Sequence, residues 1–389
     1  MASSAERAPR RRVVGIVAGE ASGDLLGSRL IGALRELAPQ LEFIGIGGPR
    51  MQSAGMEVLF PLEKLAVRGY LEVARHAVGI LGIRRRLRRR FVANPPDVFI
   101  GIDAPDFNLG LEKSLKAHGI PTVHYVSPAI WMWRKERIHG IKRAVSKMLT
   151  LFPFEAALYR DAGIDVEFVG HPLADILDQV PGREAAREQL RVPAAATVIA
   201  LLPGSRQSEL EHMADLFIQT AKAIGQSAPQ AQFLVPLVTR ETRAMFEAAL
   251  FRNHAGDLPL TVLFGHAQDA MAAADVVLVA SGTATLEAAL LGRPMVITYK
   301  MPAASHWLLK GKGYLPYYGL PNILAGEFVV PEIIQDDATP QNLSQALLNL
   351  LDDEVVRTRL ERKFAAMRAS LQRGAARRAA LAVLPLLGL

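Results

Sequence analysis

The feature that most constrains the fold of this chain is a repeated alternation of short apolar runs with longer helical patterns. The runs are nearly continuous and rich in β-branched residues and leucine, which is typical of strands buried on both faces of a parallel sheet. The predicted strands are Val13–Ala18, Glu42–Ile46, Val98–Ile102, Thr122–Val126, Met148–Phe152, Val166–Val169, Val198–Leu202, Gln232–Leu237, Thr261–Phe264, Val276–Ala280 and Met295–Tyr299.

Helical patterns lie between these runs. They are Leu25–Leu37, Leu109–His118, Glu155–Ala162, Met213–Ile224 and Thr285–Leu291. This alternation predicts an α/β fold with right-handed crossovers between parallel strands. Glycine, proline and charged residues cluster at 170–190, so we expect the chain to divide there into two Rossmann-like domains that face a central cleft. Ligands of such sheets bind at the carboxyl ends of the strands.

Composition excludes some functions and favours others. The 389 residues include no cysteine, which excludes disulfides and thiolate chemistry and removes the strongest zinc ligands. The formal charge of +7 indicates an anionic partner, such as a nucleic acid, an anionic lipid or a phosphorylated metabolite. No signal peptide is apparent, and the longest charge-free apolar stretch, Ala379–Leu389, is too short to span a bilayer. We therefore expect a soluble or peripheral protein.

An apolar strand, a Ser-Gly-Thr turn and a helix follow one another at 274–297. Free backbone N–H groups where Gly282 and Thr283 open the helix can bind an anion, helped by the helix dipole. Glu287 lies one turn deeper on the same helix face as Thr283, and its carboxylate could accept hydrogen bonds from both hydroxyls of a ribose. The alternative is a capping turn beginning at Ser281 and a solvent-facing acid.

A second candidate anion site follows the first strand of the second half, in the sequence LLPGSRQSE. Gly204 and Ser205 open a helix, and Arg206 brings a planar cation to the same position. The segment lacks the GK[ST] of a Walker A loop. We interpret it as a diphosphate clamp that acts together with the Ser-Gly-Thr turn. Asn322, in a Pro/Gly-rich loop, could offer its side-chain amide to the same phosphate or to a sugar.

The loop after the first strand reads AGEASGDLLG. Its glycines, Gly23 among them, permit close backbone approach, and Ser22 or Asp24 could cap the following helix. The spacing is not that of a dinucleotide fingerprint. Glu20 stands at the strand end, either as a substrate ligand or as an ordinary polar loop residue.

Asp103 and Asp106 follow another buried strand, in the sequence GIDAPDFN. Paired acids can be a general base, a divalent metal site or a helix N-cap, and the metal reading is the weakest because no third ligand lies nearby. Asp106 has the position of a cap, whereas Asp103 is the candidate base. Trp131 and Trp133 follow the next strand and form either a sugar-stacking wall or packing under a loop.

Residues 84–90 read RRRLRRR. On a helix, four apolar residues form one stripe, with arginines such as Arg84 and Arg88 around it. The stripe consists of Ile80, Ile83, Leu87 and Phe91. An apolar ridge flanked by arginines is typical of a helix that lies in an anionic membrane interface. The alternatives are a core-packed ridge with solvated arginines and, with less support, a nucleic-acid patch.

Taken together, the motifs resemble one family along nearly the whole chain: the lipid-A-disaccharide synthases, glycosyltransferase family 19. The matching segments are GEASGD (19–24), GIGGPRM (45–51), DAPDFN (103–108), YVSPAIWMWR (125–134), PFE (153–155), GHPL (170–173), LPGSR (202–206), ASGTATLE (280–287) and LPNIL (320–324). The resemblance implies a GT-B fold and transfer of 2,3-diacylglucosamine from its UDP derivative to 2,3-diacylglucosamine 1-phosphate (lipid X). It also implies the cytoplasmic face of the Gram-negative inner membrane as the place of action.

The resemblance implies roles for particular residues. The family's essential aspartate corresponds to Asp103, its essential donor-side arginine to Arg206 and its loop asparagine to Asn322. By analogy with other GT-B enzymes that use UDP-sugars, Glu287 should hold the ribose. The expected acceptor-side residues are Glu20, Ser22, Gly23, Asp24, Asp106 and Trp133. Arginine and helix dipoles would neutralise the departing diphosphate, so we expect neither a metal nor another cofactor.

The expected organisation is an acceptor domain at 1–170, a UDP-sugar donor domain at 171–352 and C-terminal helices at 353–389 that pack back across both. Expected partners are the two lipid substrates and an anionic inner-membrane surface, without nucleic acid, and a homo-oligomer stays open. Two alternatives to this function also stay open: a UDP-sugar 2-epimerase of the same fold and a non-catalytic basic binding protein.

Overall fold

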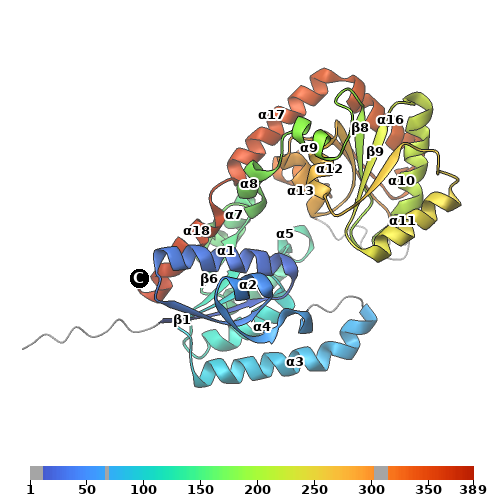
Figure 1. Ribbon diagram of the computed structural model, residues 1–389. Helices are drawn as coiled ribbons and strands as arrows, with labels where there is room; N and C mark the ends of the chain where they lie inside the picture. Colours follow the sequence, from blue (N-terminus) through green and yellow to red (C-terminus); the bar gives the residue numbers. More distant parts are fainter. Residues whose placement is uncertain (1–11, 66–69, 302–313) are drawn as a thin grey trace, which may run out of the picture. The chain divides into compact units, whose positions relative to one another are not determined.

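The computed structural model describes residues 12–65, 70–301 and 314–389, shown in Figure 1. The side chains of Glu63, residues 70–78 and Trp133 lie outside what it describes. The chain forms two compact units, of which the first comprises Met1–Pro172 with Leu371–Leu389 and the second comprises Leu173–Ser370. The boundary therefore falls close to the expected residue 170, and the expected C-terminal segment is divided between the units at residue 370.

The first unit contains a seven-stranded parallel sheet in the order β3-β2-β1-β4-β5-β6-β7. Its strands are β1 (Arg12–Ala18), β2 (Leu41–Gly47), β3 (Met56–Pro61), β4 (Val98–Ile102), β5 (Thr122–Tyr125), β6 (Lys147–Thr150) and β7 (Val166–Phe168). The strand order reverses between β1 and β4, and in sheets of this kind ligands bind at the carboxyl ends of the two strands where it reverses.

Helices cover both faces of this sheet, with α1 and α18 packed together on one face and α3 and α4 on the other (Figure 1). The helices are α1 (Ala21–Leu37), α2 (Pro49–Ser53), α3 (Tyr70–Ala93), α4 (Pro105–Lys116), α5 (Ile130–Trp133), α6 (Ile138–Ala144), α7 (Pro153–Asp161) and α18 (Ala375–Val383). Because α18 belongs to this unit, the end of the chain returns to the domain in which the chain begins.

The second unit repeats the same order of strands, β10-β9-β8-β11-β12-β13, in a six-stranded parallel sheet. The strands are β8 (Val198–Leu202), β9 (Gln232–Leu237), β10 (Leu260–Phe264), β11 (Val276–Ala280), β12 (Met295–Tyr299) and β13 (Glu332–Ile334). The edge strands β3 and β13 are the two that the sequence did not predict. An edge strand is buried less completely, so its apolar pattern is weaker.

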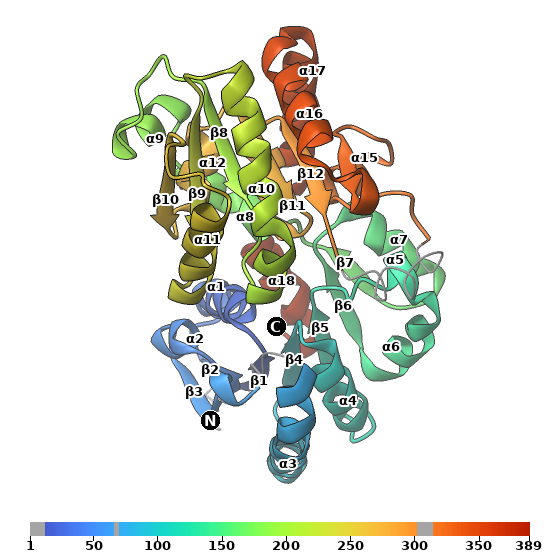
Figure 2. The same cartoon turned by 90° about the vertical axis from the view of Figure 1, so that its right-hand side faces the viewer.

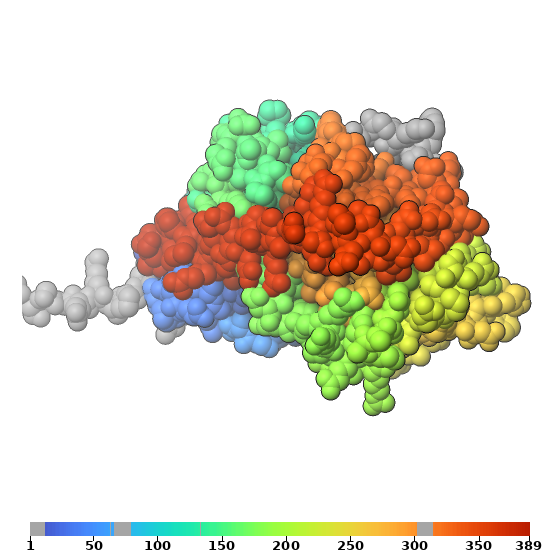
Figure 3. Space-filling view, turned by 90° about the horizontal axis from the view of Figure 1, so that it is seen from above, coloured from blue at the N-terminus to red at the C-terminus, as the bar shows by residue number. Residues whose placement is uncertain are grey.

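Helices α10, α11 and α16 pack together against the second sheet (Figure 2), and α12 packs with α9 and α13 in another group. The helices of this unit are α8 (Pro172–Ile176), α9 (Arg183–Gln189), α10 (Gln207–Ser227), α11 (Arg240–Arg252), α12 (Ala267–Ala273), α13 (Thr283–Leu290), α15 (Leu320–Ala325), α16 (Pro340–Asp352) and α17 (Glu354–Leu371), the first and last of which cross the unit boundary. Helix α17 lies at the surface (Figure 3), where it exposes Val355 and buries Leu360 and Phe364.

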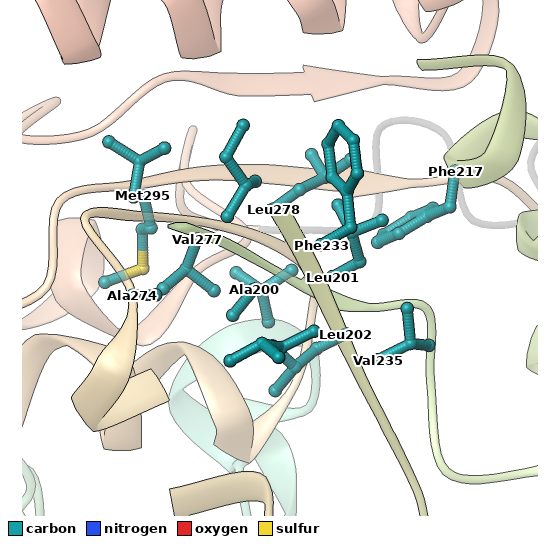
Figure 4. Close-up of a cluster of buried hydrophobic side chains, with 14 of the residues drawn as sticks. Ala200, Leu201, Leu202, Phe217, Phe233, Val235, Ala274, Val277, Leu278 and Met295 are labelled. Atoms are coloured by element: carbon teal, nitrogen blue, oxygen red, sulfur yellow. The ribbon is translucent and has the colours of Figure 1, made fainter. Parts of the chain in front are cut away.

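The core of the second unit explains why its strands read as unbroken apolar runs. Every residue of β8 and β11 is buried. Leu201 and Leu278 of these strands lie with Phe233 of β9 in one cluster (Figure 4). Helices on both faces exclude water from a central strand, so each of its side chains must be apolar. The predicted α/β fold with two Rossmann-like domains is confirmed.

The apolar ridge of α3 faces the interior of the first unit. Ile83, Leu87 and Phe91 are buried and pack with Phe99 of β4, and the rings of Phe91 and Phe99 lie 5.9 Å apart. Ile80 is partly buried against the same cluster. The prediction that these residues face a membrane is therefore wrong, because the ridge packs in the core of the first unit, whereas the arginines around it remain at the surface.

Replacing Leu87 by alanine tests this placement. The leucine is fully buried, so Leu87→Ala should lower the free energy of unfolding by about 2–5 kcal/mol, measured by denaturant titration. Leu81→Ala on the same helix is the matched control, because Leu81 is exposed and its loss should change stability by less than about 0.5 kcal/mol. Equal effects of the two substitutions would contradict burial of the ridge.

Candidate active site

A left-handed turn at the end of β4 carries the candidate base. Asp103 and Ala104 have φ angles of 50° and 44°, a conformation that is uncommon for residues other than glycine and costs free energy. The N–H of Asp103 donates to the carbonyl of Tyr125 at 2.8 Å. Helix α4 begins at the next residue. The chain thus reverses sharply and leaves the Asp103 side chain partly exposed at the edge of the sheet.

The loop after β1 lies against this turn. A Cβ atom placed on Gly19 would lie 2.4 Å from the Cβ of Ala104, so only glycine permits this approach. Glu20 and Ser22, the next polar residues of the loop, are exposed. A Cβ atom placed on Gly23 would lie 3.2 Å from the Cβ of Ala18. The structure therefore brings Glu20 and the Asp103 turn to the ends of the neighbouring strands β1 and β4, whereas the sequence predicted only that each follows a strand.

Asp24 has a different role from the one predicted. It is buried, and its carboxylate accepts from the backbone N–H groups of Gly48, Met51 and Arg50 at 2.8, 3.0 and 3.1 Å. These N–H groups belong to the first turn of α2, which the aspartate caps. The prediction that Asp24 contacts the acceptor is wrong, because the carboxylate is buried and both of its oxygens accept from backbone N–H groups at the start of α2. Nor does it cap α1, which begins at Ala21.

Asp106 and the tryptophans also differ from expectation. Ala104, rather than Asp106, is the N-cap of α4, and the exposed Asp106 carboxylate accepts from Arg137 at 2.9 Å. The cap prediction for Asp106 is therefore wrong. Trp131 is buried and packs edge-on against Phe154 at 5.1 Å, which is the packing alternative of the sequence analysis. The side chain of Trp133 lies outside the described residues.

A buried acid of the PFE segment, to which the sequence analysis gave no role, lies under the loops after β5 and β6. Glu155 accepts from the N–H of Phe152 at 3.0 Å and from the indole of Trp131 at 3.1 Å. Burial raises its pKa to about 7, with these hydrogen bonds opposing the rise. Its position as the third residue of α7 could have identified it, because acids there reach back to the N-cap.

In the second unit, the segment predicted to bind a diphosphate is hydrogen-bonded to a carboxylate of the protein itself. The carboxylate of Glu209 accepts from the N–H groups of Ser205 and Arg206 at 2.8 and 3.2 Å. Gly204, with a φ of 131°, lies so close that an added Cβ would meet the Glu209 side chain at 2.6 Å. The start of α10 thus binds an anionic group of the chain itself, and the diphosphate contact stays a prediction. The Ser205 amide is already hydrogen-bonded to Glu209, which the sequence analysis missed.

Arg206 stands at the same helix start and remains largely in solvent. Its side chain is 77% exposed and lies 3.7 Å from the Glu209 carboxylate. An ion pair at this long distance, with its cation in solvent, contributes little to stability. The guanidinium is therefore able to turn toward another anion at small cost.

The Ser-Gly-Thr turn leaves the start of α13 open. Gly282, with a φ of 150°, and Thr283 are both exposed, while the hydroxyl of Ser281 donates to the carbonyl of Tyr318 at 3.3 Å. Glu287 lies half-buried one turn deeper, and burial raises its pKa. Among the described residues, the structure shows no hydrogen bond or ion pair of the Glu287 carboxylate.

Asn322 is fully buried and hydrogen-bonded at both ends of its amide. Its nitrogen donates to the carbonyl of Val330 and the carboxylate of Glu332 at 2.9 and 2.8 Å, and its oxygen accepts from Val329 and Val330. Glu332 also accepts from the N–H groups of Tyr318 and Gly319. The prediction that Asn322 contacts the phosphate or the sugar is wrong, because its amide braces the loop that follows β12.

Three arginines of α3 line a pocket between this helix and α4. Arg84, Arg85 and Arg88 face Gly110, Leu111 and Ser114 around a volume of about 280 Å³. Arg84 also donates to the carbonyl of Asp106 at 3.3 Å. Within the described parts of the chain, no three or more histidines and acids lie together as ligands for a metal ion, and none of the helices has an apolar stretch that could span a bilayer.

Two parallel sheets with the same strand order, each with polar residues at its carboxyl edge, define a protein of the GT-B class. Solved structures share this fold. A UDP-N-acetylglucosamine 2-epimerase (putative in its own description) from Listeria monocytogenes is 12% identical, with a TM-score of 0.64 over 95% of this chain and 94% of its own. The glycotransferase of kitacinnamycin is 18% identical, with a TM-score of 0.63 over 97% of this chain and 100% of its own.

The chain belongs to the lipid-A-disaccharide synthetase family, whose model matches residues 14–384. The lipid-A-disaccharide synthase of Methylobacillus flagellatus is 57% identical over 371 residues, which are 95% of this chain and 98% of that protein. The enzyme of the same name from Chromobacterium violaceum is 56% identical, over 95% of this chain and 96% of its own. The resemblance found in the sequence motifs is confirmed.

Proposed function

We propose that this chain is an inverting glycosyltransferase that joins UDP-2,3-diacylglucosamine to 2,3-diacylglucosamine 1-phosphate. The products are the β-1,6-linked lipid A disaccharide 1-phosphate and UDP. The observation that carries this proposal is the family match along nearly the whole chain. It does not favour either alternative, the 2-epimerase or the non-catalytic binding protein. The direct test is release of UDP from the donor that depends on the added acceptor, with the stereochemistry of the product determined.

The first unit would bind the acceptor, and Asp103 would be its general base. The 6-hydroxyl oxygen of the acceptor attacks C1 of the donor sugar, and its proton passes to the Asp103 carboxylate. The bond from C1 to the diphosphate oxygen breaks as the new bond forms. The left-handed turn supports this role because it holds the carboxylate at the strand end, where proximity and orientation lower the barrier. Glu20 and Ser22 are exposed on the adjoining loop and would bind the acceptor sugar.

The second unit would bind UDP. The exposed start of α13 at Gly282 and Thr283 offers backbone N–H groups to one phosphate. The start of α10 would offer the N–H groups now bonded to Glu209, once the phosphate displaces that carboxylate. Arg206 would then neutralise the charge that develops on the leaving diphosphate. Glu287, which has an unused carboxylate among the described residues, would accept from the ribose hydroxyls.

The Asp103→Asn variant tests the general base. It should lower kcat by roughly 10²–10⁴-fold, the range for loss of general base catalysis, with little change in the KM of either substrate. The matched control is Asp106→Asn, the same substitution three residues further on at an exposed ion pair, which should keep near-normal turnover. An Asp103→Asn enzyme with normal kcat and KM would end the assignment of this residue as the base.

The Glu287→Gln variant tests the ribose contact through its pH dependence. The ionised carboxylate accepts from the hydroxyls, and burial raises its pKa. Affinity for UDP should therefore be full at high pH and should fall as the pH drops through that raised pKa, above the ordinary glutamate range. The variant should bind UDP about tenfold more weakly and lose this dependence, as calorimetry can measure. Glu247→Gln, at an exposed site of the same unit, should behave like the native protein.

We also propose that the protein binds peripherally to the anionic cytoplasmic face of the inner membrane. The pocket lined by Arg84, Arg85 and Arg88 supports this, because arginines near a surface are attracted to anionic headgroups and form bidentate hydrogen bonds with phosphate. The core uses the apolar ridge of α3, so the association would depend on charge at this part of the surface.

Charge reversal tests this association. Changing Arg84, Arg85 and Arg88 together to glutamate should weaken binding to phosphatidylglycerol-containing vesicles at least about 100-fold, as measured by sedimentation, and should not change binding of UDP. Reversal of three exposed arginines of the second unit is the control with the same change in net charge. It uses Arg243, Arg359 and Arg362. Equal loss of vesicle binding in both variants would argue against a role specific to the α3 arginines.

A further inference from the structure

Three fully buried polar residues lie directly beneath the Asp103 turn, and the proposed substrate contacts do not use them. Asn108 and Glu112 stand one turn apart on α4, and His124 lies on β5. Each has no exposed surface. The surrounding layer between α4 and the sheet is otherwise apolar and includes Phe107 and Leu111. Burying polar groups in such a layer costs free energy, so their presence requires an explanation.

Asn108 bonds directly to the turn. Its side-chain nitrogen donates to the carbonyl of Asp103 at 2.8 Å and lies 3.3 Å from that of Ile102 and 3.5 Å from that of Val17. These carbonyls lie at or near the ends of β4 and β1, where the chain leaves the sheet. A buried carbonyl without a donor is costly. One side chain thus ties together the two strand ends on which the candidate acceptor site stands.

Glu112 and His124 support the same position from below. The Nδ1 of His124 lies 2.7 Å from the Oε1 of Glu112, and burial raises the pKa of Glu112 while the histidine opposes the rise. In the sheet register, His124 is paired with Gly101. A Cβ on Gly101 would lie 2.1 Å from the Glu112 carboxylate and 2.9 Å from the Cβ of Asn108. The glycine therefore makes room for both side chains.

This cluster is not optimised for stability. Among the described residues, Asn108 Oδ1, Glu112 Oε2 and His124 Nε2 have no hydrogen-bond partner. Each unsatisfied buried group costs free energy. An apolar α4 face would avoid that cost, but it would remove the donor that Asn108 offers to the Asp103 carbonyl. Proteins keep energetically unfavourable local features of this kind mainly at functional sites.

We propose that Asn108 is a positioning residue that holds Asp103 in its left-handed conformation, and that the Glu112–His124 pair fixes the face of α4 from which Asn108 acts. The effect on turnover rests on the proposed role of Asp103 as the base. The effect on the conformation of the turn does not. The two can therefore be tested separately.

The first test is the Asn108→Leu variant, which keeps the number and branching of the side-chain heavy atoms and removes the donor. The N–H of Asp103 should lose protection from hydrogen exchange, because its bond to Tyr125 depends on the turn. Turnover should fall roughly 10²-fold, as expected for misplacement of a reacting group by about 1 Å, with both KM values within about twofold of native. If this variant does not fold, Asn108→Ser serves instead, since its hydroxyl is too short to reach the carbonyls.

Thr150→Val is the control for loss of a buried polar group. Thr150 is fully buried on β6 in the same unit, and its hydroxyl has no partner among the described residues. This variant should keep native kcat and native exchange at Asp103. Glu112→Gln is the conservative variant of the supporting pair, because an amide oxygen can still accept from His124. Glu112→Gln should keep most of the native turnover. Glu112→Leu should lose turnover and should also lose the protection of the Asp103 N–H from hydrogen exchange.

The outcomes separate the positioning role from the proposed chemistry. Native exchange at Asp103 in folded Asn108→Leu would overturn the positioning proposal, and so would equal losses of kcat in Asn108→Leu and Thr150→Val. If exchange at Asp103 increases but neither Asn108→Leu nor Asp103→Asn lowers kcat, the positioning role stands and the base assignment fails. Increased exchange with a selective loss of kcat supports both.

Discussion

The reversal of strand order within each sheet is the constraint on which the candidate site depends. The crossovers from β1 and β4 leave toward opposite faces, so no helix covers the carboxyl ends of these two neighbouring strands. Glu20 and the Asp103 turn occupy that position in the first unit. The same reversal between β8 and β11 places the Gly204–Arg206 segment and the Ser-Gly-Thr turn at one edge of the second sheet. One topological rule thus positions both the proposed acceptor group and the proposed anion sites.

At both sheet edges, a side chain of the protein itself is hydrogen-bonded to the backbone groups that surround the candidate site. Glu209 already occupies the N–H groups at the start of α10, so a phosphate would replace one anion by another rather than fill an unsatisfied site. Asn108 likewise holds the strand-end carbonyls beneath Asp103. In both places the protein contributes a group that stabilises the edge before substrate binds. Electrostatic preorganisation of this kind lowers the cost of reorganisation during the reaction.

Sequence reasoning succeeded where local pattern and chemistry coincide. The alternation of apolar runs predicted both sheets, and the motifs identified the family. It failed for Asp24 and Asn322, and for the ridge residue Leu87. Each of these residues has the expected chemical character, but contacts with other segments bury it: α2 for Asp24, the Val329–Val330 backbone for Asn322, and β4 and α4 for Leu87. A capping acid and a ligand acid have the same side chain, so the local sequence does not distinguish them.

The sequence by itself therefore determined the fold class, the family and the strand ends at which the polar residues lie, because periodicity and motif spacing are local properties of the chain. Only the tertiary structure decided which of those residues remain available to a ligand. Asp103, Glu20, Arg206 and Glu287 keep exposed or unused polar atoms, whereas Asp24 and Asn322 do not. The physical reason is that a hydrogen-bonding group is free only if no buried backbone group requires it, and this depends on which segments the fold brings together.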